Sequence, residues 1–308
     1  MSRPLITAVG SFPLGSGTPE ESLRYYVELQ LKLGFGLITD GEPRHDMISY
    51  LVGDIPGLGF VRGKAAVVGR IAEPRNLREC LKVKDLNLVR NLLSERASNK
   101  PVKIAVTGPV TLGFTCALGG SGPYSGPVDP SLYDDLAFSL GSLASYLQSS
   151  GAVVQIDEPG LSGGFINPTK GVNYLRRMTS GLDPNRTVVH VCGRISRRLN
   201  EELLKLGDVD VLSHAFASSP ENLDVLDRER FLEAGKSLGA GIARVGIAEP
   251  EKADSPEEIA ALLRSVQRRI GEEVVRYVHP DCGLRSTNTD AATTLLTNLS
   301  RAVGASTD

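Results

Sequence analysis

Short apolar runs alternate with longer amphipathic segments along the chain. The apolar runs have the length of buried strands, and the segments between them repeat their apolar residues at helical spacing. The runs predict strands at residues 5–12, 35–40, 102–107, 153–156, 187–192, 209–215, 241–246 and 274–278. The longer segments predict helices at residues 20–33, 85–97, 131–149, 170–179, 196–205, 228–237, 255–269 and 288–303. Strands and helices that alternate in this way are typical of α/β proteins with a parallel sheet.

The predicted fold is α/β, a single (β/α)8 TIM barrel that spans residues 1–308 as one domain. Eight strands, each followed by a helix, are what such a barrel requires. Residues 60–71 are rich in Val and alternate in polarity, which predicts a hairpin-like insertion after the second strand. An open doubly wound sheet is the alternative. The first strand, however, is not followed by the Gly-x-Gly-x-x-Gly turn that binds dinucleotides.

Composition and charge exclude several classes of partner. The chain has 308 residues, of which 41% are hydrophobic and 23% are charged, an ordinary globular composition. A formal net charge of -2 gives no basic surface for nucleic acid. No apolar run approaches the roughly 20 residues of a transmembrane helix, and the first residues contain no apolar leader. We therefore expect no nucleic-acid or membrane partner and a cytoplasmic location.

Most of the chemically active side chains fall where an apolar run ends. In a (β/α)8 barrel the active site lies at the carboxyl ends of the strands, so these positions are candidates for function. They are Ser11, Asp40, Glu42, Thr107, Asp157, Glu158, His190, Cys192, His214, Arg244, Asp281 and Cys282. Each alone could serve a turn or a helix cap. Their shared position is more specific than any one of them.

His190 and Cys192 close the fifth predicted strand. Side chains alternate across a strand, so these two point to the same side. Imidazole and thiolate are preferred zinc ligands, and the pair could form half of a tetrahedral site. Cys282, just after the last predicted strand, is the best candidate for a third ligand. The remaining cysteines, Cys80 and Cys116, are expected to be structural or incidental.

Taken together, these motifs resemble the zinc-containing catalytic barrel of the cobalamin-independent methionine synthase family. The resemblance covers nearly the whole chain, and its motifs lie at strand ends in the family's order. They are Val-Gly-Ser-Phe-Pro (9–13), Asp-Gly-Glu-Pro (40–43) with Asp46-Met47, Thr-Gly-Pro-Val-Thr (107–111), Gln-Ile-Asp-Glu-Pro (155–159), His-Val-Cys (190–192) and His-Pro-Asp-Cys-Gly-Leu (279–284).

The resemblance implies two groups of site residues. The zinc ligands would be His190, Cys192 and Cys282. The residues that hold the amino acid part of homocysteine would be Ser11, Glu42 and Asp157. Carboxylates suit the substrate ammonium, whereas a hydroxyl and backbone N–H groups suit its carboxylate. Zinc deprotonates a bound thiol, whose pKa is otherwise about 8.5, so no catalytic residue beyond the zinc site is expected.

The fourth zinc ligand departs from the family pattern. Members usually carry a Glu on the sixth strand, and Ala215 stands at that position here. His214 is its neighbour, but neighbours on a regular strand face opposite ways. His214 therefore replaces the Glu only if the strand end is irregular, as it can be at a bulge. Otherwise the protein supplies three ligands.

Three further departures concern the folate side of the family's reaction. The chain has the length of one barrel, so we expect it to lack the contacts by which the second barrel of the large members helps hold a polyglutamylated folate. Gly246 falls near the position of the proton-donating His. The folate-side Trp is missing as well, because the chain has no Trp. The resemblance is thus closest to the short core methionine synthases of archaea and some anaerobic bacteria. It implies a methylcorrinoid donor, either free methylcobalamin or a methylated corrinoid protein.

The leading hypothesis is a zinc-dependent methyltransferase that converts homocysteine into methionine with this donor. One alternative is a related zinc alkyltransferase acting on another thiol such as coenzyme M. Glu42 and Asp157 favour an ammonium group over the sulfonate of that thiol. The other alternative is a non-catalytic binding barrel, which the missing Glu would allow.

Overall fold

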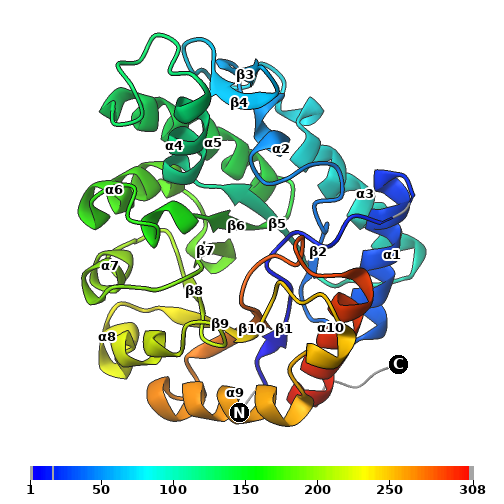
Figure 1. Cartoon of the computed structure of the whole chain (residues 1–308). Helices are drawn as coiled ribbons and strands as arrows, with labels where there is room; N and C mark the ends of the chain where they lie inside the picture. The colour runs from blue at the N-terminus through cyan, green and yellow to red at the C-terminus, as the bar shows by residue number, and fades with distance from the viewer. Residues whose placement is uncertain (1–2, 16, 305–308) are drawn as a thin grey trace.

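The computed structural model describes residues 3–15 and 17–304. Its main sheet has eight parallel strands surrounded by helices, which confirms the predicted TIM barrel (Figure 1). Within this sheet, neighbouring strands follow the order β1-β10-β9-β8-β7-β6-β5-β2. The strands are β1 (Leu5–Ile6), β2 (Ile38–Thr39), β5 (Val102–Thr107), β6 (Val153–Asp157), β7 (Thr187–Val191), β8 (Val211–Ala215), β9 (Ser237–Ala243) and β10 (Val275–Pro280).

Strands β1 and β2 stand at the two ends of this series, and backbone hydrogen bonds bring them together. Gly36 and Leu37 donate their N–H groups to the carbonyl of Ile6, at 3.0 and 3.3 Å. The sheet therefore curls back on itself, which is how a barrel removes exposed sheet edges.

The helices that follow the strands lie on the outside of the barrel. They are α1 (Pro19–Lys32), α2 (Ser49–Val52), α3 (Leu81–Glu95), α4 (Pro109–Gly119), α5 (Pro130–Ser149), α6 (Pro168–Thr179), α7 (Arg197–Leu203), α8 (Arg228–Glu233), α9 (Pro256–Ile270) and α10 (Thr289–Val303). Helices α1 and α9 both begin with a capping box, in which the N-cap hydroxyl and the Glu three residues later satisfy each other's backbone N–H. None of the helices in the described residues is both long and apolar enough to cross a membrane.

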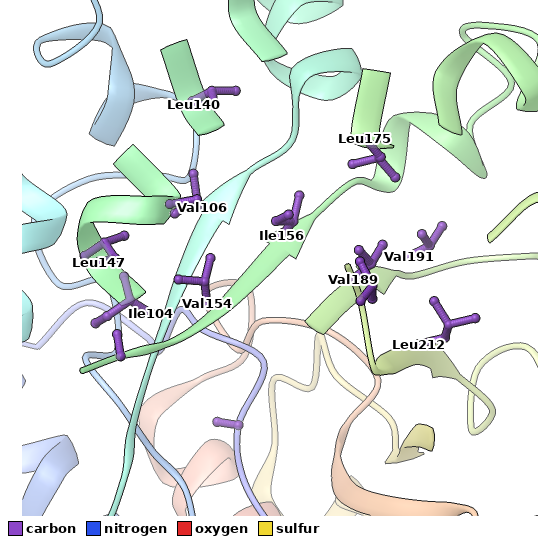
Figure 2. Close-up of a cluster of buried hydrophobic side chains, with 14 of the residues drawn as sticks. Ile104, Val106, Leu140, Leu147, Val154, Ile156, Leu175, Val189, Val191 and Leu212 are labelled. Carbon is purple, nitrogen blue, oxygen red and sulfur yellow. The ribbon is translucent and has the colours of Figure 1, made fainter. Parts of the chain in front are cut away.

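Alternate residues of the strands face the helices and form the main hydrophobic core. Figure 2 shows part of this layer, where Val154, Ile156, Val189 and Leu212 project from neighbouring strands toward the helices. The opposite residues face the barrel interior. A smaller apolar cluster there is made by Leu37, Val153, Val188, Val211 and Tyr277. Closer to the carboxyl ends of these strands, the residues that face the interior are polar.

The insertion after β2 is a hairpin, as predicted. Strands β3 (Leu58–Val61) and β4 (Lys64–Val67) are antiparallel, and Arg62 and Gly63 turn between them with φ of 50° and 77°. Positive φ at both central residues is typical of tight hairpin turns. The hairpin packs on α4 (Figure 1). Gly119 permits this approach, because a Cβ there would lie 2.2 Å from the carbonyl oxygen of Ala65.

Helix α4 and strand β9 are two of the elements that differ from the prediction. Helix α4 was not predicted; it is buried on most sides, so it lacks the polar face that reveals a surface helix. Strand β9 begins at Ser237 and ends at Ala243, whereas a strand was predicted at residues 241–246. Its first five residues, Ser-Leu-Gly-Ala-Gly, lack the β-branched side chains that indicate a strand.

Candidate metal centre and substrate pocket

His190, Cys192 and Cys282 converge at the carboxyl ends of the strands. One ligand atom from each of these residues lies within 4.8 Å of the others. His190 is the penultimate residue of β7, Cys192 follows that strand, and Cys282 follows β10. Both thiols are free and partly buried. Two sulfurs and one imidazole nitrogen form a donor set that suits zinc and leaves one tetrahedral position open.

The surroundings of His190 leave one ring nitrogen available. Its Nδ1 lies 2.8 Å from the Ser213 hydroxyl oxygen, whereas its buried Nε2 has no hydrogen-bond partner within the described residues. Burial lowers the pKa of His190 well below its usual value, so the ring is neutral near pH 7. A neutral imidazole with an unpartnered buried nitrogen is what a metal ion requires, and the residues present therefore fit zinc.

The two thiols influence each other. The hydrogen bond from Cys282 lowers the pKa of Cys192, and the same hydrogen bond raises the pKa of Cys282. Cys192 is therefore the first of the pair to become a thiolate. The second thiol needs a cation beside it before it can ionise as well.

His214 does not join this group. Strand β8 pairs regularly with both neighbours from Val211 to His214, so the irregular strand end that would turn His214 inward is not present. His214 is buried on the opposite face of β8 from Ser213, and its Nδ1 lies 3.2 Å from the Val191 carbonyl oxygen. Ala215 offers no ligand atom. The donor group found in the described part of the chain thus has three members.

A cavity of about 320 Å³ opens onto the three potential ligands. It is lined by Val9, Ser11, Glu42, Asp46, Met47, Asp157, Pro159, His190, Cys192, Cys282, Gly283, Arg285 and Ser286. All three predicted substrate-binding residues are in this set. The cavity therefore has sulfur and imidazole at one part of its wall and carboxylates at another.

Glu42 is held by a buried lysine from α3. Lys82 is 1% exposed, and its Nζ lies 2.5 Å from a carboxylate oxygen of Glu42 and 3.9 Å from Asp40. The same ammonium lies 4.1 Å from the ring centroid of Tyr50. Glu42 itself has φ of 50°, an unusual conformation that directs its side chain into the pocket.

Asp157 is the last residue of β6 and is oriented by Gln155 of the same strand. The Gln155 amide donates to Asp157 at 2.7 Å and to the Val9 carbonyl at 2.8 Å, while Lys103 donates to Gln155 at 2.6 Å. Burial raises the pKa of Asp157 well above its usual value, and the Glu42 charge raises it further. A bound ammonium would reverse this effect, so the two carboxylates could hold a cation.

Ser11 is tied to the loop after β10. Its carbonyl accepts a hydrogen bond from the Leu284 N–H at 2.6 Å, and a Cβ on Gly283 would lie 2.2 Å from the Ser11 hydroxyl. A side chain at position 283 would therefore displace the Ser11 hydroxyl. Arg285 from the same loop donates to the carbonyls of Glu42 and His45, the latter at 2.9 Å.

The other strand-end candidates have structural roles. Thr107 donates to the Met47 carbonyl, and Glu158 accepts hydrogen bonds from the first turn of α4. Asp281 accepts three backbone N–H groups from residues 216–218. Arg244 pairs with Asp254.

Sequence analysis missed Lys82, Ser213 and Arg285. Each is distant in sequence from the residue it supports, and none belongs to a local motif. His279, which also supports the site, could have been found from the sequence, because it stands in the His-Pro-Asp-Cys motif.

A sequence model of the family described as "Cobalamin-independent synthase, Catalytic domain" matches residues 14–305. The chain belongs to this family. The methionine synthase of Methanothermobacter thermautotrophicus is 30% identical and aligns over 97% of this chain and 99% of its own. A 5-methyltetrahydropteroyltriglutamate–homocysteine methyltransferase of Mycobacterium tuberculosis is 26% identical, and the match covers 89% of this chain but 36% of that protein.

The fold of this family member is also that of a solved B12-independent methionine synthase from Shewanella sp. W3-18-1. The two chains superpose with a TM-score of 0.76 at 21% identity, over 98% of this chain and 97% of the other. The predictions of the family and of a methyltransferase are confirmed, and a non-catalytic barrel is set aside.

The predicted methylcorrinoid donor and corrinoid-protein partner are wrong. The matching family is described as cobalamin-independent, and its mycobacterial members are named for a pteroylglutamate donor. The prediction rested on missing folate contacts, chiefly Gly246 and the lack of Trp. A missing side chain removes one interaction without creating a surface for a different donor.

Proposed function

We propose that this chain forms one zinc-dependent methyltransferase barrel that methylates the thiol of homocysteine to give methionine. The observation that carries the proposal is the buried Nε2 of His190, which has no hydrogen-bond partner among residues 3–15 and 17–304. It lies beside two thiol sulfurs, on the wall of a pocket that also contains carboxylates. His190, Cys192 and Cys282 would hold the metal. Bound there, zinc would lower the pKa of the substrate thiol. The thiolate would form the new sulfur–methyl bond as the bond between the methyl group and the donor breaks, and the donor would keep that electron pair and take up a proton from water.

The pocket's residues would orient the amino acid part of the substrate. Glu42 and Asp157 would bind the ammonium, and Ser11 with neighbouring N–H groups would bind the carboxylate. The pocket volume of about 320 Å³ suits a small amino acid together with part of a donor. These contacts fix the substrate sulfur near the two cysteines, which turns the attack into a step within one complex.

For the donor we propose 5-methyltetrahydropteroyltriglutamate, because the mycobacterial relatives are named for it. The purified chain should form methionine from this donor and homocysteine, with about one zinc per chain. Chelation should abolish the reaction and zinc should restore it. Zinc binding without methionine formation would contradict the donor.

A chain with cobalt in place of zinc tests the binding of homocysteine independently of the methyl donor. Its visible absorption spectrum should change when homocysteine is added without any donor, because a thiolate enters the coordination sphere. An unchanged spectrum would contradict homocysteine as the metal-bound acceptor.

Asp157→Asn should raise the KM for homocysteine by about 10–100-fold, with a smaller effect on kcat. The substitution keeps the shape of the side chain but removes a charge-assisted hydrogen bond, worth about 1.5–3 kcal/mol. Steady-state kinetics at varied homocysteine would measure the change. Asp254→Asn is the control, because Asp254 is also buried but pairs with Arg244 outside the pocket. Equal KM changes in both variants would contradict the role of Asp157.

A further inference from the structure

A chain of side chains inside the barrel connects His190 to the backbone of β10. The Ser213 hydroxyl oxygen lies 2.8 Å from His190 Nδ1 and 2.8 Å from His279 Nε2. His279 Nδ1 lies 2.7 Å from the Pro280 carbonyl oxygen. All three side chains are 2% exposed or less. These four groups thus form one buried series from β7 across β8 to β10.

The direction of every hydrogen bond in this series follows from its last member. A carbonyl oxygen can only accept, so His279 carries its proton on Nδ1. The Nε2 of a neutral His279 is then an acceptor, and the Ser213 hydroxyl must donate to it. The Ser213 hydroxyl has one hydrogen, which it donates to His279, so its oxygen accepts a hydrogen bond from the N–H at Nδ1 of His190. His190 is therefore left with a lone pair on Nε2.

We propose that Ser213 and His279 are positioning residues that fix His190 in the tautomer whose Nε2 can bind a metal ion. The inference rests on the proposed zinc site, and it assigns a role to two residues that do not contact the metal. The buried Nε2 agrees with it, since the series uses Nδ1 and no described residue forms a hydrogen bond with Nε2. Such supporting groups typically change metal affinity by about 10–100-fold.

Strand β9 leaves room for this series. Gly239 lies beside it, and a Cβ at that position would be 3.0 Å from the Ser213 Cβ and 3.1 Å from His279 Nε2. The φ of Gly239 is not in the left-handed region, so the backbone does not require glycine there. Glycine is needed at position 239 because a Cβ there would crowd the side chains of Ser213 and His279.

Ser213→Ala tests the proposal with a small change. The metal-free variant should lose the single His190 tautomer, and its zinc dissociation constant should rise by about 10–100-fold in competition with a chelator. Ser213→Thr keeps the hydroxyl and should recover most of the affinity. Gly239→Ala keeps every hydrogen-bonding group but crowds His279, and it should weaken zinc binding as well.

The tautomer is read independently of metal or activity by two-bond ¹H–¹⁵N correlation spectra of the metal-free chain. The sequence has four histidines, so the signals lost in a His190→Gln variant are those of His190, and His45→Gln and His214→Gln assign two of the others. Ser300→Ala is the matched control, because it removes an equally buried hydroxyl whose 2.8 Å hydrogen bond reaches Leu33. It should leave the tautomer and the zinc affinity unchanged.

The failures of the two proposals are distinguishable. A wild-type His190 protonated at Nε2 would overturn the positioning role of Ser213 and His279. A Ser213→Ala variant with unchanged tautomer and zinc affinity would overturn it as well. A wild-type chain that binds no zinc but has His190 protonated at Nδ1 would overturn the proposed metal site and support the hydrogen-bond series.

Discussion

Cys282→Ala is expected to remove zinc from the protein and with it the methyl transfer. Cys282 supplies one of three potential ligand atoms, and it is the one that comes from the far end of the chain. Loss of a group behind a ligand already costs about 10–100-fold in metal affinity, so loss of the ligand itself should cost more than about 100-fold. Zinc content after dialysis and chelator competition would measure this.

The chain contains its own controls for this experiment. Cys80 and Cys116 are also free and are 2% and 0% exposed, but they lie in the hydrophobic core away from the pocket. Cys80→Ala and Cys116→Ala remove the same thiol and should reduce stability while leaving zinc content unchanged. A Cys282→Ala protein with wild-type zinc affinity would contradict the three-residue site.

Lys82→Met is expected to destabilise the fold by about 3–5 kcal/mol. The substitution keeps the length of the side chain but leaves Glu42 and Asp40 buried without their ammonium partner, and a buried charge without a partner is costly. Urea unfolding monitored by circular dichroism would give the free energy of unfolding.

The penalty should grow as the pH rises. Burial raises the pKa of Asp40 to about 7 from 3.8, although the Lys82 charge lowers it. A carboxyl whose folded pKa is raised contributes stability below its unfolded pKa and loses it as pH rises through the folded value. Without Lys82 the folded Asp40 pKa rises further, so the stability difference that Asp40 contributes should be constant below about pH 7 and widen as the pH rises above that value.

Lys236→Met is the matched control for this pH dependence. Lys236 is 7% exposed and donates to the carbonyls of Leu206 and Val209, which do not titrate. Its loss should cost about 1–3 kcal/mol without the same increase at higher pH. A Lys82→Met penalty that is small, or that shrinks as pH rises, would contradict the role of Lys82 as the partner of the two carboxylates.

Local patterns in the sequence were sufficient for the barrel and for part of the site. Strand β5 was predicted with its observed bounds, because its apolar run has sharp ends. The shared face of His190 and Cys192 followed from strand alternation alone. Helix α4 and the start of β9 were missed because a fully buried helix and a glycine-rich strand lack the usual periodicity.

The sequence by itself determined the alternation of strands and helices, the positions of polar residues at strand ends, and the candidate donors His190, Cys192 and Cys282. Only the tertiary structure decided that His214 turns away, that Lys82 meets Glu42, and that Ser213 and His279 stand behind His190. The physical reason is that local periodicity fixes the side of a strand on which a residue lies. Its partners depend on the register of neighbouring strands and helices, which the closed barrel sets.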